Sequence, residues 1–124
     1  MPAPKDAIRS STVPVILSLL SEQSMYGYEM VRLVNARTNG VLEWKEGTLY
    51  PVLHQLEADG LIQGEWRDVK TDAGETAERQ RKYYMLTRSG RAELKKRVAE
   101  WRAFAAAVGG LLSERFTSPR SSLA

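Results

Sequence analysis

The apolar residues of the stretch 45–60 repeat with the period of a helix. They form one stripe with the spacing i, i+3, i+4, i+7, at Leu49, Val52, Leu53 and Leu56. The opposite face is small and weakly charged, and it consists of Gly47, Pro51, His54 and Ala58, flanked by Tyr50 and Gln55. Gly60 supplies the left-handed residue that ends a helix. The pattern predicts a short helix that buries one face and presents the other to a second surface.

The chain before this stretch begins with a proline-interrupted, polar segment at residues 1–9, which we expect to be an arm. Candidate N-caps follow at Ser10–Thr12, and Pro14 suits a first helical turn. Residues 15–20 are apolar on more than one side. These features predict a first helix that is buried between two neighbours.

A second helix is predicted from Tyr26, and Asn39–Gly40 would stop it. Residues 41–44 alternate between apolar and polar, as in a very short strand. This strand would lead directly into the helix at 45–60.

Two β-like runs follow, at residues 61–67 and 81–86, and both are rich in aromatic and branched residues. The segment Asp68–Glu78 between them is polar and has no periodicity, so it predicts a hairpin tip in solvent. Three helices and a hairpin are the plan of a winged helix-turn-helix. We therefore predict a mainly α, α+β winged-helix domain over residues 10–88.

A long last helix is predicted over residues 89–116, with Thr87 as its cap. Its apolar positions are separated by four and three residues in turn, as in a coiled-coil seam. They are Leu94, Val98, Trp101, Ala105, Val108 and Leu112. We interpret this seam as a dimer interface. The alternative is that the helix packs on its own domain, because Phe104 and Leu111 broaden the stripe. Residues 117–124 form a polar tail that we expect to be disordered.

Composition narrows the function without naming it. The 124 residues suit one domain, and the net charge of +3 agrees with an anionic partner. There is no cysteine and one histidine, and no nucleophile, phosphate-loop or metal-ligand motif is present. We therefore expect no enzyme, no catalytic residue, no metal and no cofactor. We also expect a cytoplasmic protein, because no apolar run could span a bilayer and no signal peptide is visible.

The order and spacing of three motifs resemble the PadR family of transcriptional regulators. They are Tyr26-Gly27-Tyr28-Glu29, then Gly47-Thr48-Leu49-Tyr50-Pro51 with Gly60-Leu61-Ile62, and finally Arg81-Lys82-Tyr83-Tyr84 with Leu86-Thr87 and Gly90. The resemblance covers about residues 10–112, nearly the whole chain. The compact size resembles the smaller subfamily, which includes multidrug-sensing members. The resemblance implies a homodimeric winged-helix repressor whose last helices cross near the dimer axis.

Such a dimer would read a pseudo-palindromic site on double-stranded DNA. The candidates for contact with base edges are Thr48, Tyr50 and His54, with Gly47 and Pro51 permitting close approach. The candidates for contact with phosphate are the amides of Tyr26 and Gly27, together with Lys45, Arg79, Arg81 and Lys82. Each has a simpler interpretation: His54 as a surface histidine, Tyr50 as partly core, and the hairpin cations as a solvated strand face. The hairpin tip carries Asp68, Asp72, Glu75 and Glu78, so we expect it to avoid DNA.

Trp101 lies in the middle of the predicted seam, where a two-fold axis would bring two such rings together. The rings would form a slot for a planar aromatic effector, with Val98, Ala105 and Val15 as further candidates. The resemblance to multidrug-sensing relatives favours this slot, and the alternative is an interface anchor without ligand. No carboxylate follows Trp101 within a turn, while Arg97 and Arg102 flank it, which favours neutral or anionic aromatics.

A rival hypothesis is a dimeric winged-helix module that binds proteins and has lost DNA binding. It is motivated by Glu57 and Asp59 on the helix predicted at residues 45–60 and by the scarcity of cations there.

Overall fold

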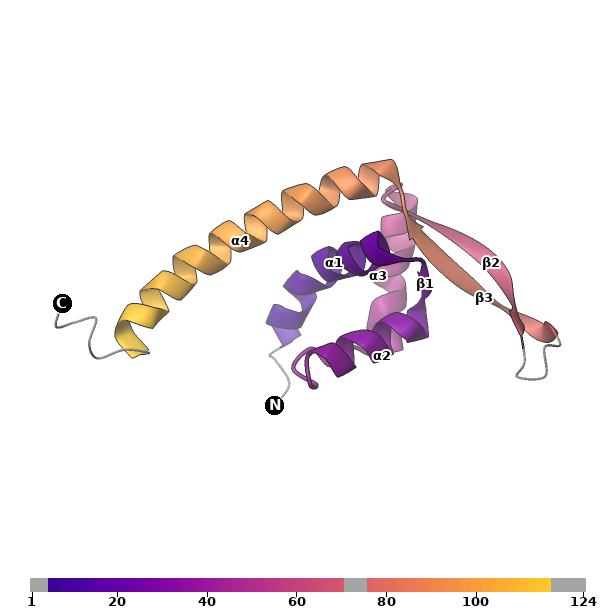
Figure 1. The fold of residues 1–124 in the computed structure, drawn as a ribbon, viewed down its shortest axis with the longest axis horizontal. Helices are drawn as coiled ribbons and strands as arrows, with labels where there is room; N and C mark the ends of the chain where they lie inside the picture. The colour runs from indigo at the N-terminus through magenta and orange to yellow at the C-terminus, as the bar shows by residue number, and fades with distance from the viewer. Residues whose placement is uncertain (1–4, 71–75, 117–124) are drawn as a thin grey trace. The chain divides into compact units, whose positions relative to one another are not determined.

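The computed structural model describes residues 5–70 and 76–116, and the side chains of residues 10–69 and 80–112 (Figure 1). The elements are α1 (Lys5–Glu22), β1 (Met25–Tyr26), α2 (Gly27–Arg37), α3 (Glu46–Ala58), β2 (Ile62–Lys70), β3 (Thr76–Leu86) and α4 (Arg88–Phe116). Helices and a small antiparallel sheet in this order confirm the predicted fold class. The tail at 117–124 lies outside the described residues.

The chain divides into two compact units, residues 1–94 and residues 95–124. The first contains three helices, the sheet and the first turns of α4. The second contains the remainder of α4 as a single helix.

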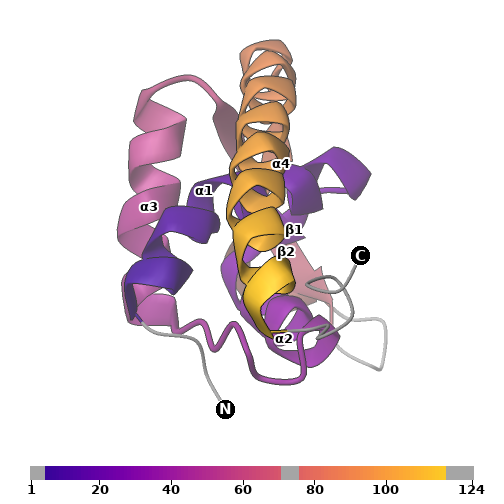
Figure 2. The same cartoon turned by 90° about the vertical axis from the view of Figure 1, so that its left-hand side faces the viewer.

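The core of the first unit lies between α1, α2 and α3 (Figures 1 and 2). Ile16 and Leu17 from α1, Met30 from α2 and Leu53 from α3 have no exposed surface. Each such side chain contributes about 1.5–3 kcal/mol when it leaves water. The predicted stripe of α3 is confirmed, because Leu49, Leu53 and Leu56 are buried and Val52 packs against the core. Gly60, with a φ of 78°, follows the helix as predicted.

The first helix differs from the prediction at its start. It begins at Lys5, before the expected caps at Ser10–Thr12, so part of the expected arm is helical. Pro14 consequently lies inside the helix, where it removes one backbone donor, and not in the first turn. The expectation that residues 15–20 are buried on several sides is confirmed by Ile16, Leu17, Leu19 and Leu20.

The prediction of a short strand at residues 41–44 is wrong, because these residues form a loop. Trp44 is buried in a loop, where its N–H donates to Asn35 Oδ1 at 2.8 Å and its carbonyl accepts from Asn35 Nδ2 at 3.4 Å. A single asparagine side chain thus satisfies the groups that a strand partner would otherwise satisfy. The extra strand is β1, which precedes α2 and which the sequence pattern did not reveal.

The sheet has the order β1-β3-β2 and is antiparallel throughout. The hairpin strands are longer than predicted, because β2 runs to Lys70 and β3 begins at Thr76. Asp68, which we placed in the tip, belongs to β2 and accepts a hydrogen bond from Gln80 of β3 at 2.9 Å. Asp72 and Glu75, and the side chain of Glu78, lie outside what the structure describes.

The start of α4 is fastened to the turn that follows α3. Thr87 Oγ1 accepts from the Gly90 N–H at 3.0 Å, which confirms the predicted cap. The same hydroxyl donates to the carbonyls of Gly60 and Leu61, at 2.6 and 3.0 Å. A Cβ on Gly90 would collide with the Leu61 carbonyl oxygen. Only glycine therefore allows the first turn of α4 to approach this closely.

Candidate nucleic-acid interface

The outer face of α3 is open to solvent, as the sequence predicted. Gly47, Thr48, Pro51 and His54 are all exposed, and nothing lies within 4 Å of a Cβ built on Gly47. Lys45 precedes the first helical residue and is also exposed. This face can approach another surface closely and offers hydroxyl and imidazole groups for hydrogen bonds.

Tyr50 turns from this face toward the start of α2. A Cβ built on Gly27 would lie 2.8 Å from the Tyr50 hydroxyl oxygen and 2.9 Å from two ring carbons. Burial raises the pKa of the Tyr50 hydroxyl, and the Glu46 carboxylate raises it further. The hydroxyl therefore keeps its proton at neutral pH and is available as a donor beside the first amides of α2.

The N-terminus of α2 is capped by the side chain of Glu29, which lies in the first turn of the same helix. Tyr26 takes an extended conformation before the helix, and its backbone N–H donates to Glu29 Oε1 at 3.4 Å. The helix thus begins one residue later than predicted, with Tyr26 contributing to β1 and not to the helical face.

A hollow of about 290 Å³ opens where α2, α3 and the hairpin meet. It brings together six residues that the sequence proposed separately, namely Tyr26, Gly27, Tyr50, His54, Arg81 and Lys82. Its other lining residues are Trp66, Gln80 and Tyr84, which sequence reasoning did not propose. Gly47, Thr48, Pro51 and Lys45 lie outside it, and the side chain of Arg79 lies outside the described side chains.

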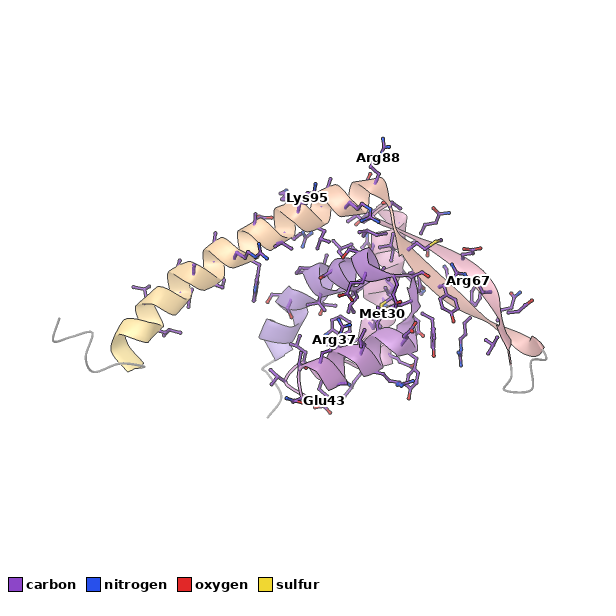
Figure 3. The ribbon with its side chains drawn as sticks, viewed as in Figure 1. Met30, Arg37, Glu43, Arg67, Arg88 and Lys95 are labelled. Carbon is purple, nitrogen blue, oxygen red and sulfur yellow. The ribbon has the colours of Figure 1, made fainter. Side chains whose placement is uncertain are left out.

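Two arginines of the hairpin are held on aromatic rings. The Arg81 guanidinium lies 4.4 Å from the ring centre of Tyr26, and that of Arg67 lies 4.6 Å from the ring centre of Tyr83. The two tyrosine rings meet edge to face at 5.4 Å. Arg67 lies on the hairpin (Figure 3) and stands directly opposite Arg81 in the register of β2 and β3.

This pair of arginines places two positive charges side by side, and the sequence did not reveal it. Like charges directly opposite in a sheet repel each other, and the rings hold both in place. Glu65 compensates Arg67 only at the surface, at 3.3 Å between exposed side chains. The pair could have been found only from the register of β2 and β3, which places two residues fourteen positions apart in the sequence beside each other.

Lys82 is different from its neighbour Arg81, because it has an acidic partner. Its Nζ lies 2.8 Å from Glu57 Oε1 of α3. The bond from Lys82 lowers the pKa of the Glu57 carboxyl, and the same bond raises the pKa of the Lys82 ammonium. Lys82 therefore contributes less free charge to this face than its sequence position suggested.

The second unit presents an apolar face on α4. Trp101 is 47 % exposed and Phe104 is 61 % exposed, and their ring centres are 6.2 Å apart. Val108, Leu111 and Leu112 are exposed as well, as is Ala105, while Val98 is half-buried.

Two other residues of the predicted seam and slot belong to the first unit. Leu94 packs against the core of its own chain, in the way that the alternative interpretation of this helix expected. Val15 is half-buried against the same core.

Other kinds of site find no support within the described ranges. No group of three or more His, Cys, Asp or Glu residues there is placed to hold a metal ion. None of the helices in that part of the chain has the length and apolar character to cross a membrane.

Known proteins with similar sequences and folds are transcriptional regulators. The sequence model of the family described as "Transcriptional regulator PadR-like family" matches residues 16–96. An uncharacterized protein of Lysinibacillus sphaericus is 40 % identical over 96 residues, which are 77 % of this chain and 83 % of the relative. The solved structure of a transcriptional regulator from Clostridium thermocellum has a TM-score of 0.74 and 30 % identity, over 86 % of this chain and 95 % of the other. A PadR family regulator from Eggerthella lenta has a TM-score of 0.72 and 31 % identity, over 86 % of each chain.

Proposed function

The chain belongs to the PadR-like family of transcriptional regulators, which bind DNA, and on this premise we propose which residues contact the DNA and what controls it. The outer face of α3 enters the major groove, where Thr48 and His54 face base edges, and Gly47 and Pro51 allow close approach. Lys45, at the start of the same helix, contacts phosphate. The observation that carries this assignment is that Gly47, Thr48, Pro51 and His54 are all exposed on one face of α3, with open space at Gly47.

Phosphate binding is assigned to the rim of the hollow. The Gly27 amide, at the first position of α2, has no helical partner by position and favours an anion. The Tyr26 amide precedes the helix and donates to Glu29 Oε1, so Tyr26 remains a candidate from sequence alone. The Tyr50 hydroxyl lies beside Gly27, so we assign it to phosphate in preference to the base edge proposed from sequence. Arg81 supplies a positive charge from the hairpin, and Arg79 remains a candidate from sequence.

The active species is a homodimer joined along α4. The exposure of Trp101, Val108 and Leu112 supports this assembly, because an apolar helix face of this kind gains stability when a second copy covers it. Val98 and Ala105 complete the seam. Leu94 contributes only indirectly, since its own core holds it.

The regulator is a repressor that a flat aromatic compound releases from its operator. The effector lies between the Trp101 rings of the two copies, with Val98, Ala105 and Val15 as further candidates. The exposure of Trp101 and its neighbour Phe104 supports a stacking site. Arg97 and Arg102 beside Trp101 in the sequence favour neutral or anionic compounds over cations.

DNA binding is tested by a gel shift with the DNA upstream of the protein's own gene at two salt concentrations. A repressor binds there and loses affinity steeply as salt rises, because bound phosphates release counterions. Failure to bind at low salt would favour the rival hypothesis, a protein-interaction module of the same fold.

The effector is tested by titrating tryptophan fluorescence with anionic and cationic planar aromatics. The Trp101→Ala variant serves as a control for signal from Trp44 and Trp66. Quenching by the anionic compound that disappears in the variant supports the slot, and preference for the cation contradicts it.

A further inference from the structure

One carboxylate on α3 binds both strands of the hairpin. Glu57 Oε1 accepts from Lys82 Nζ of β3 at 2.8 Å, and Glu57 Oε2 accepts from the Gly64 backbone N–H of β2 at 3.1 Å. The side chains of Lys82 and Glu57 are 25 % and 30 % exposed, so solvent screens the pair only in part. Both oxygens of Glu57 are therefore used to hold the hairpin against the helix.

Gly64 makes room for this arrangement. A Cβ at this position would collide with Lys82 Cε and would lie 3.0 Å from Glu57 Oε2. Two rings flank the ammonium group as well, with Nζ 5.5 Å from the ring centre of Tyr84 and 5.9 Å from that of Trp66. Three elements thus converge on Lys82.

The preceding residue of the strand, Arg81, has the opposite environment. Adjacent residues of a strand point to opposite faces, so Lys82 is turned toward α3 while Arg81 lies over Tyr26. The acidic partner belongs to Lys82, and Arg81 is held by a neutral ring. The two cations of this dipeptide are therefore equipped for different tasks.

We infer that Lys82 is a positioning residue, which with Glu57 and Gly64 fixes the hairpin relative to α3. Arg81 and Arg67 on the hairpin then stand at a set distance from the base-reading face of α3. The inference rests on the proposed function, since it concerns how two DNA-contacting elements are kept in register. It reassigns Lys82, which the sequence placed among the phosphate contacts.

The Glu57→Gln variant separates positioning from simple electrostatics. Removing an anion from a DNA-binding face strengthens binding if charge alone matters. Loss of the ion pair weakens binding if the carboxylate positions the hairpin, and we expect a loss of about three- to tenfold. Binding that is as tight as wild type, or tighter, overturns the inference.

Salt dependence separates Lys82 from Arg81. Affinity for the upstream DNA is measured by fluorescence anisotropy over a series of KCl concentrations for Lys82→Gln and for the matched variant Arg81→Gln. Arg81→Gln should reduce the slope of log affinity against log salt by about 0.9, the value for one phosphate. Lys82→Gln should lower affinity and leave the slope unchanged. An equal reduction of slope in both variants would show that Lys82 binds phosphate.

The double variant Glu57→Gln/Lys82→Gln completes a thermodynamic cycle. It should lose no more affinity than the weaker-binding single variant, because the two residues act as one unit. If the fold-losses in DNA affinity of the two single variants multiply in the double variant, the two residues act independently and the inference is contradicted. Gly64→Ala provides a variant that keeps both charges and should weaken binding in the same way.

Circular dichroism at the assay temperature shows whether each variant is folded, and affinities are compared only among folded proteins. If wild type fails to bind the DNA, the proposed function fails. If wild type binds with a steep salt dependence while Glu57→Gln binds no worse, only the inference about positioning fails.

Discussion

Gly27 at the start of α2 lies directly against the ring of Tyr50 on α3, where a Cβ would come within 2.8 Å of the tyrosine hydroxyl oxygen. The contact joins the two helices at the rim of the hollow. It also places a protonated hydroxyl next to the first amides of α2. This one glycine therefore controls both the packing of the helices and the placement of a donor group.

We predict that Gly27→Ala weakens DNA binding by about tenfold, which corresponds to about 1.4 kcal/mol. The added methyl group must push the Tyr50 ring aside, since the space is already filled. Anisotropy with upstream DNA measures the effect. The control is to introduce Gly27→Ala into a Tyr50→Ala variant. Because the ring is then absent, the added methyl group should cause little further change in the fold.

Gly47→Ala should separate stability from binding. Nothing lies within 4 Å of a Cβ at this position, and alanine in a helix is favoured over glycine by up to about 1 kcal/mol. Urea unfolding should show equal or higher stability, while DNA affinity falls because the methyl group meets the DNA. Unchanged affinity would remove Gly47 from the interface.

Tyr50→Phe should lower DNA affinity by about three- to tenfold without changing its salt dependence, because a neutral hydroxyl releases no counterion. The raised pKa of Tyr50 adds a statement about pH. The hydroxyl stays protonated below its ordinary value of 10.0, so the difference between wild type and variant should be constant from pH 6 to about pH 9. A difference that vanishes within this range would contradict the assignment.

The dimer seam on α4 predicts which exposed residues matter for assembly. A charge at Val108 or Leu112 should produce monomers, as measured by light scattering. Leu111→Glu is the matched control, since Leu111 is 69 % exposed but lies off the seam. Leu94 is unsuitable for this test, because a charge there would disrupt its own core. Dimers in all variants would place the interface elsewhere.

The Glu57–Lys82 pair predicts a pH profile for folding. Lys82 holds the pKa of Glu57 below its ordinary value of 4.5, so the carboxylate stabilises the fold above that pH and loses its effect as pH falls through the lowered pKa. Glu57 raises the pKa of Lys82 above 10.5, so that contribution is complete below pH 10.5 and is lost as pH rises through the raised pKa.

Glu57→Gln should therefore be less stable than wild type by about 1 kcal/mol at pH 7. Urea unfolding at pH 7 and at pH 3 checks this difference. It should shrink at the lower pH, where the carboxyl begins to take up a proton. An equal difference at both values would mean that the charge of Glu57 does not contribute.

Features set by local sequence were predictable. The stripe of α3 and its glycine stop follow from periodicity and backbone preference, which act over a few residues. The cap at Thr87 likewise needs only its neighbours along the chain. The exposed face with Gly47 and His54 followed from the same helical geometry.

Features set by distant partners were not predictable in the same way. The sequence places Lys82 among the phosphate contacts because its partner Glu57 is 25 residues away and no local pattern reveals it. The strand at Met25–Tyr26 has two residues and exists only because β3 pairs with it. Trp44 showed an alternating pattern, yet a side chain of α2 satisfied its backbone first. Local pattern cannot decide such competitions, since their outcome depends on which groups the fold brings together.

The fastening of Thr87 and Gly90 to the turn after α3 bears on how the protein can be divided. A truncation at the boundary between β3 and α4 would remove Gly90 and leave the Leu61 carbonyl without part of its cover. It would also strip Leu94 from the core. The smallest fragment that we expect to fold by itself therefore extends through Leu94. The first turns of α4 are thus a structural part of the first unit.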